Sequence, residues 1–157
     1  RGSISANLQG IASSARTRFH LAPEALVYQQ RVEPGTSMVM GDADELKAAV
    51  WNLIDNAVKY SSSDVKVHVV LEAVDGERLA IKVSDQGVGI SPVELKRIFR
   101  RFYRVPASVA IRAKGSGLGL FIVHEIARAH DGSVDVTSNP EVGTTFTIVL
   151  PRATRSA

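Results

Sequence analysis

Three short segments, far apart in the chain, limit what it can fold into. Residues 52–60 carry two amides, an ammonium and a phenol, residues 85–90 place one carboxylate beside two glycines, and residues 115–120 contain three alternating glycines. A fold that uses all three must bring a polar helix face, a carboxylate and a glycine-rich helix entrance together. These are the parts that a pocket for a metal-bound nucleotide needs.

The first segment is predicted to present its polar groups on one side of a helix. Asn52, Asn56, Lys59 and Tyr60 fall at positions i, i+4, i+7 and i+8, so they share a face beside the apolar stripe. An amide oxygen suits Mg²⁺, Lys59 can bind a phosphate as a point charge, and Tyr60 can close one side of a nucleotide. Taken alone, such residues more often form a solvated helix face.

The second segment supplies a candidate for base recognition. Asp85 ends an expected strand, where its carboxylate can accept a hydrogen bond from the amine of adenine, contributing about 1.5 to 3 kcal/mol. Guanine has a carbonyl at that position and would be repelled. Gly87 and Gly89 allow backbone geometry that a side chain would block. The alternative is an ordinary turn at the end of a strand.

The third segment predicts an anion site. Gly115, Gly117 and Gly119 lead into an expected helix, so free backbone amides can point at phosphate oxygens. It is not a dinucleotide fingerprint, because Leu120 stands where the last glycine of that motif should be, and the chain has no GxxxxGK[ST] loop. A purely structural glycine turn remains the alternative.

With Phe99-Arg100-Arg101-Phe102-Tyr103-Arg104 between the last two segments, the order resembles the N, G1, F and G2 boxes of sensor histidine kinases. The resemblance is to their ATP-binding catalytic domain, runs from about Gly41 to Leu150, and is strongest to kinases of the PrrB type. It implies the Bergerat ATP-binding fold, with ATP and Mg²⁺ as cofactors.

The resemblance also implies the roles of individual residues. Asn56 would be the metal ligand, Asn52, Lys59 and Arg104 the catalytic residues, and residues 100–116 an ATP lid. Thr144 matches the last box of the family and would support the adenine through its hydroxyl or a water. The implied nucleotide contacts are Asn56, Lys59, Tyr60, Asp85, Gly87, Gly89, Ile90, Phe102, Arg104, Lys114, Gly115, Ser116, Gly117, Leu118, Gly119, Leu120 and Thr144.

One residue separates a kinase from the related switch ATPases. Those ATPases place a glutamate four residues before the metal-binding asparagine, as general base for water, whereas this chain has Asn52 there. An amide cannot take a proton at neutral pH. The expected function is therefore transfer of the γ-phosphate to a histidine on a separate hairpin domain. A GHKL-type switch ATPase or a non-catalytic nucleotide sensor is the alternative.

The histidines offer no acceptor for that phosphate within the chain. His124 and His130 are six residues apart, and His20 lacks the acidic neighbour and the helix of the family's acceptor site. We therefore expect the acceptor domain to be missing and the chain alone not to autophosphorylate. The expected partners are that dimerisation domain and a cognate response regulator, and the chain itself is expected to be a monomer.

The amino-acid composition excludes several other classes of protein. The 157 residues are 45% hydrophobic, contain no cysteine, and carry 19 basic and 16 acidic residues without a sustained basic run. One globular domain, no disulfide and no nucleic-acid binding are expected. No stretch is apolar enough to span a bilayer, and the chain begins at Arg1. We expect a cytoplasmic piece of a membrane-anchored sensor, attached through missing N-terminal segments.

The chain is expected to divide into a linker or the end of a preceding helix (1–16), the ATP-binding domain (17–152) and a tail (153–157). Short strands are predicted at 19–21 and 37–40, a hairpin over 65–69 and 79–83, and closing strands at 134–137 and 144–150. Helices are predicted from Asp42, after Ser91 and over 118–129. The resulting fold class is α+β: a mixed, mainly antiparallel sheet of about five strands with about three helices on one face.

Overall fold

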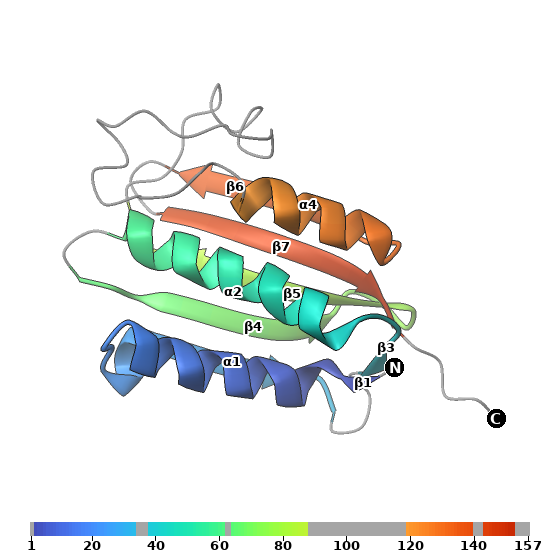
Figure 1. Cartoon of the computed structure of the whole chain (residues 1–157), viewed down its shortest axis with the longest axis horizontal. Helices are drawn as coiled ribbons and strands as arrows, with labels where there is room; N and C mark the ends of the chain where they lie inside the picture. The colour runs from blue at the N-terminus through green and yellow to red at the C-terminus, as the bar shows by residue number, and fades with distance from the viewer. Residues whose placement is uncertain (1, 34–37, 62–63, 88–118, 140–142, 153–157) are drawn as a thin grey trace.

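The computed structural model of the chain describes residues 2–33, 38–61, 64–87, 119–139 and 143–152. Three helices, α1 (Ile4–Arg18), α2 (Ala43–Tyr60) and α4 (Gly119–Ala129), lie side by side over one face of a five-stranded sheet (Figure 1). The strand order is β2-β4-β5-β7-β6. Only the β2–β4 pair is parallel among these neighbours, so the predicted α+β class and mixed, mainly antiparallel sheet are confirmed.

The strands of the large sheet vary from six to nine residues. They are β2 (Leu26–Arg31), β4 (Val67–Ala73), β5 (Arg78–Asp85), β6 (Ser133–Asn139) and β7 (Gly143–Pro151). A separate two-residue ladder joins β1 (Gly2–Ser3) to β3 (Met38–Val39), within the segment predicted as a strand at 37–40. The helix predicted after Ser91 and the lid at 100–116 lie outside the described residues.

Helix α2 starts where the sequence predicts. Asp42 caps it, because its carboxylate oxygen Oδ1 accepts hydrogen bonds from the backbone amides of Asp44 at 2.9 Å and Glu45 at 3.1 Å. The apolar stripe along the helix is buried. Its members are Leu46, Ala49, Val50, Leu53, Ile54 and Ala57. The stripe packs α2 against the sheet. The adjacent polar face of the helix lies outside the core.

The N-terminal segment is helical, which is one of the two forms expected for residues 1–16, a linker or the end of a preceding helix. Residues 4–18 form a complete helix, and Leu8, Ile11, Ala12 and Ala15 are all buried in the hydrophobic core. Their spacing of three, one and three residues is the spacing of one helix face. Because two of the four are alanines, the stripe is easy to overlook in the sequence, although small side chains allow α1 to pack closely on α2.

The strand predicted at residues 19–21 is wrong. Phe19, His20 and Leu21 instead close the C-terminus of α1: the amide of Leu21 donates to the carbonyl of Arg16 at 2.9 Å, and His20 has a φ of 54°. Phe19 stacks on Trp51 of α2, with ring centroids 5.8 Å apart. The strand in this region is β2, a few residues later, and it pairs in parallel with β4.

The predicted hairpin is confirmed as β4–β5. Asp75 organises the turn, and hydrogen bonds from the Glu77 amide and the Arg78 side chain lower the pKa of its carboxyl. One face of the hairpin is core, while the other carries the ion pair between Lys82 Nζ and Glu72 Oε1 at 2.6 Å. The predicted helix at 118–129 corresponds to α4, and the closing strands to β6 and β7.

His130 ties the end of α4 to the start of α2. Its Nδ1 lies 2.8 Å from the carbonyl oxygen of Ile126, and its Nε2 accepts a hydrogen bond from the amide of Asp42 at 3.1 Å. The ring also occupies the space that a side chain on Gly41 would need, because a Cβ there would lie 2.2 Å from Cδ2 of the imidazole. The contact places the end of α4 beside the start of α2, and the two helices run antiparallel (Figure 1).

Replacing His130 by alanine should therefore destabilise the domain by about 1 to 3 kcal/mol, since two hydrogen bonds are lost and the Asp42 amide is left without its partner. Urea denaturation measures the effect. His68→Ala is the matched control, because His68 is exposed on the open face of the sheet. Equal stabilities of the two variants would contradict the role assigned to His130.

Candidate functional site

Among the described residues, those singled out in the sequence gather at one end of the sheet. Because β5 and β7 are antiparallel, the end of β5 lies beside the start of β7, with Ser84 opposite Thr145. The C-terminal half of α2 and the start of α4 lie at the same end (Figure 1). Segments more than fifty residues apart thus meet at a single edge of the fold.

Asp85 is the buried carboxylate of this edge. It is 6% exposed, and its Oδ1 accepts a hydrogen bond from the amide of Gly87 at 2.8 Å. Burial raises the pKa of the Asp85 carboxyl, and hydrogen bonds from the backbone amides of Gly87 and Thr144 only partly offset this. A buried carboxylate whose charge is incompletely compensated is suited to accept further hydrogen bonds from a ligand.

Gly143 and Ser138 form the immediate surroundings of Thr144. Gly143 has a φ of 129°, and a Cβ on it would lie 2.0 Å from the carbonyl oxygen of Asp85. The start of β7 can therefore approach the end of β5 only because residue 143 has no side chain. Thr144 is itself buried, and its Oγ1 lies 2.8 Å from the Oγ of Ser138 on β6.

Helix α2 contributes the amides and the ammonium. Asn52 and Asn56 are half-buried, and the Oδ1 of Asn52 is 3.4 Å from the position that a Cβ on Gly119 would occupy. The first residue of α4 therefore contacts the first amide of the predicted polar face. The Nζ of Lys59 lies 2.8 Å from Oδ2 of Asp55, one turn earlier on the same helix.

The structure brings some of the predicted site residues together, and the rest lie outside the described residues. Asp85, Gly87 and Thr144 form one cluster, and Asn52 and Gly119 another. Tyr60 is the last residue of α2 and Leu120 the second of α4. Outside the described residues lie Gly89, Ile90, Phe102, Arg104, Lys114, Gly115, Ser116, Gly117 and Leu118.

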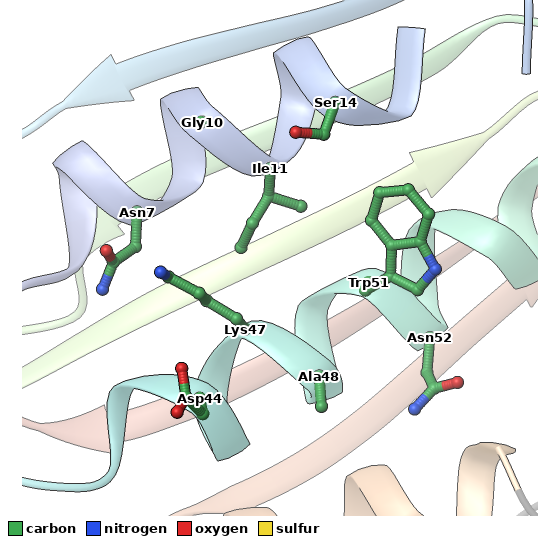
Figure 2. Close-up of a pocket in the computed structure, with 9 residues that line it drawn as sticks. All are labelled: Asn7, Gly10, Ile11, Ser14, Asp44, Lys47, Ala48, Trp51 and Asn52. Carbon is green, nitrogen blue, oxygen red and sulfur yellow. The ribbon is translucent and has the colours of Figure 1, made fainter. Parts of the chain in front are cut away.

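A groove with a volume of about 560 Å³ lies between α1 and α2, away from Asp85. Figure 2 shows its lining, with Ile11 on α1 and Lys47, Trp51 and Asn52 on α2. Asp85, Thr144 and Gly119 are not among the lining residues. The groove therefore shares Asn52 with the candidate site but is otherwise separate from it.

Sequence reasoning missed three residues that the structure connects to the site. Asp55 could have been found, because its spacing of four residues from Lys59 is that of a helical ion pair. Ser138 and the close packing of Gly143 on Asp85 had no comparable signal, because both depend on which strands pair and in what register. Within the described residues, no helix is both long and apolar enough to cross a membrane.

Residues 41–154 match the family of histidine kinase-, DNA gyrase B-, and HSP90-like ATPases. Similar curated proteins include the sensor-like histidine kinase SenX3 of Mycobacterium tuberculosis, 37% identical over 90% of this chain and 34% of its own length. The histidine protein kinase SaeS of Staphylococcus epidermidis is 39% identical over 68% of this chain and 31% of its own length. The chain thus spans about a third of the length of these relatives.

Solved structures of sensor histidine kinases are also similar to this chain. The mycobacterial sensor histidine kinase MprB superposes with a TM-score of 0.79 at 31% identity, covering 96% of this chain and 95% of that one. Full-length ShkA in complex with AMPPNP superposes with a TM-score of 0.78 at 29% identity, covering 99% of this chain and 31% of ShkA.

The chain belongs to the family of histidine kinase-, DNA gyrase B-, and HSP90-like ATPases. Within that family it is the ATP-binding catalytic domain of a sensor histidine kinase, as the sequence resemblance predicts. The narrower resemblance to kinases of the PrrB type stays a prediction.

Proposed function

We propose that the domain binds Mg-ATP at the edge formed by Asp85, Thr144 and α2, and donates the γ-phosphate to a histidine on a separate helical hairpin. The observation that carries the proposal is the buried Asp85 carboxylate, bonded by two backbone amides at the same end of the fold as the polar face of α2. The AMPPNP in the ShkA complex supports a nucleotide here.

The donor set fits this ligand. Asp85 accepts from the amine of adenine, while Thr144 contacts the base through its hydroxyl or a water. Asn56 would hold Mg²⁺ through its amide oxygen, a hard neutral ligand of the kind that suits this ion. When bound, the ion neutralises charge on the phosphate oxygens. Ile90, Phe102 and the residues from Lys114 to Leu120 would complete the nucleotide contacts.

Lys59 requires a rearrangement to act on phosphate. Its ammonium is held by Asp55 in the structure, at 2.8 Å, and both side chains are about 30% exposed. Because a helical surface pair of this kind contributes only about 0.3 to 0.5 kcal/mol, a triphosphate can compete for the ammonium. Arg104 and the amides of the glycine segment would share the task of neutralising the transferred group.

Asn52 makes transfer to a protein side chain the favoured reaction. Related switch ATPases have a glutamate at this position to activate water, and an amide cannot accept that proton. Phosphoryl transfer needs chiefly positioning and charge neutralisation, which the remaining groups supply. The imidazole of the acceptor hairpin, brought into line with the γ-phosphate, is then the nucleophile.

The experiment that tests the function mixes the purified domain, ATP labelled at the γ-phosphate and the isolated acceptor hairpin of a family member. We expect the label to appear on the hairpin as an acid-labile, base-stable phosphohistidine, with slow ADP release in its absence. Rapid ADP release without the hairpin would instead identify a switch ATPase. Binding of ATP with neither reaction would identify a nucleotide sensor.

The rest of the signalling protein is part of the proposal. The relatives are about three times as long as the matched region. We expect the longer protein to carry the acceptor hairpin, to phosphorylate a response regulator, and to hold this domain on the cytoplasmic side of a membrane.

Replacing Asn56 by alanine should lower the affinity for Mg-bound nucleotide by at least about 10- to 100-fold, the effect of removing even an outer-shell partner of a bound metal. Titration with a non-hydrolysable ATP analogue, with and without Mg²⁺, measures it. The loss should be confined to the titration with Mg²⁺. Asn7→Ala, on α1 in the groove, is the control. An equal loss without Mg²⁺ would remove Asn56 as the metal ligand.

A further inference from the structure

The groove between α1 and α2 has the size and the lining of a site for a small molecule. Its volume of about 560 Å³ lies within the range of about 300 to 1,000 Å³ that ligand pockets occupy. Ile11 and Trp51 give it apolar surface, and a few polar side chains line the rest. A ligand that fits such a groove is largely apolar and makes few polar contacts.

Trp51 provides a fixed aromatic surface in the groove. Phe19, just after the end of α1, stacks on its ring with the two centroids 5.8 Å apart, which holds the indole in place. The indole is only half-buried and borders the groove (Figure 2). A flat aromatic ring can therefore pack on the indole without the cost of ordering it first.

Lys47 supplies a positive charge to the groove. Its side chain is exposed, points from α2 toward α1 (Figure 2), and forms no ion pair with any described residue. Lys47 and Trp51 are four residues apart on α2, which is about 6 Å along the helix axis. Asp44 lies on the other side of Lys47 and repels anions, so an acid group fits between Lys47 and Trp51.

Gly10 leaves room for a ligand. It lies in the interior of α1, where glycine weakens a helix relative to alanine. A Cβ on Gly10 would meet no atom within 4 Å, so packing within the domain does not require a glycine at this position. The space that the missing side chain leaves is part of the groove.

The indole, the ammonium and the open space together define the class of ligand. We propose that the groove binds a small, flat aromatic acid, with its ring against Trp51 and its carboxylate paired with Lys47. This site is distinct from the one proposed for Mg-ATP, although Asn52 borders both.

Nuclear magnetic resonance can test the proposal directly. The chain contains a single tryptophan, so the indole N–H of Trp51 gives one signal in a proton–nitrogen correlation spectrum, and this signal reports on the groove. Titration with naphthoate should shift it to saturation with a Kd of about 0.1 to 1 mM, the range expected for so small a ligand. Neutral naphthamide has the same ring and should bind about 2- to 5-fold more weakly, because an exposed ion pair is lost. The titration needs no nucleotide, so its result is independent of the proposed function.

Two variants locate the bound acid. Lys47→Gln should lower the affinity for naphthoate by about 2- to 5-fold and abolish the preference over naphthamide. Lys66→Gln is the matched control, because Lys66 is exposed and lies outside the groove. Gly10→Leu should fill the groove and abolish the shift, and it should keep the fold because leucine favours a helix and its Cβ meets no atom. The remaining signals of the spectrum check that fold.

Three results would each overturn the proposal. They are a shift that is absent or does not saturate in the wild-type chain, equal affinities for naphthoate and naphthamide, and undiminished binding of naphthoate by folded Gly10→Leu.

Discussion

Replacing Asp85 by asparagine should lower the affinity for an ATP analogue by about 10- to 100-fold, the value of a hydrogen bond to a charged group. The carboxylate accepts from the amine of adenine, while an asparagine side chain must place its own NH₂ either toward the ligand or toward the Gly87 and Thr144 amides that bond Asp85. Calorimetric titration with the analogue measures the loss.

The stability of the nucleotide-free domain should change far less. Burial raises the pKa of Asp85, so the ionised carboxylate costs stability at neutral pH, and that stability returns only as the pH falls through the raised pKa. Asparagine removes the cost in stability of burying a charge. However, its own NH₂ can then face a backbone amide, which is also a donor, so the two effects on stability oppose each other. Asp135→Asn, on an exposed position of β6, is the control. Unchanged affinity in Asp85→Asn would exclude Asp85 from base recognition.

The same ionisation predicts how binding depends on pH. Adenine stabilises the charged carboxylate, so binding should lower the pKa of Asp85 from its raised value in the free domain. Affinity should therefore be highest above that raised pKa and decline as the pH falls through it. Asp85→Asn should not show this decline, since it has no proton to take up.

Most of the structural features that could be predicted from the sequence depend on local patterns. The Asp42 cap, the apolar stripe of α2 and the alternation in β4 and β5 depend on residues a few positions apart, and the structure confirms them. By contrast, β2 pairs in parallel with β4, about forty residues later in the chain. The sequence leaves residues 1–16 open between a linker and the end of a helix, because Ala12 and Ala15 become core residues only once α2 lies against them.

The candidate site divides in the same way. Asp85 and the amides of α2 are recognisable from residue type and spacing, because the chemistry needs those groups in those local patterns. The ring of His130 against Gly41 and the hydroxyl pair of Ser138 and Thr144 depend on pairing between distant segments. No pattern among neighbouring residues predicts such contacts, although they determine how α4 and β7 are positioned at the site.

Gly143→Ala should be strongly destabilising, because the added methyl has no room between the start of β7 and the end of β5. A Cβ there would lie 2.0 Å from the carbonyl oxygen of Asp85, and the φ of 129° strains any residue other than glycine. Strain of about 1 to 3 kcal/mol and overpacking of similar size should together lower the free energy of unfolding by about 2 to 6 kcal/mol. Urea denaturation measures this loss.

The added methyl should also weaken nucleotide binding in the molecules that remain folded. Relief of the clash requires the start of β7 to move away from the end of β5, which separates Thr144 from Asp85. Gly76→Ala is the matched control, because a Cβ on Gly76 in the β4–β5 turn meets no atom within 4 Å. If Gly143→Ala matched Gly76→Ala in both stability and affinity, the close approach of the two strands would not be what holds Asp85 in position.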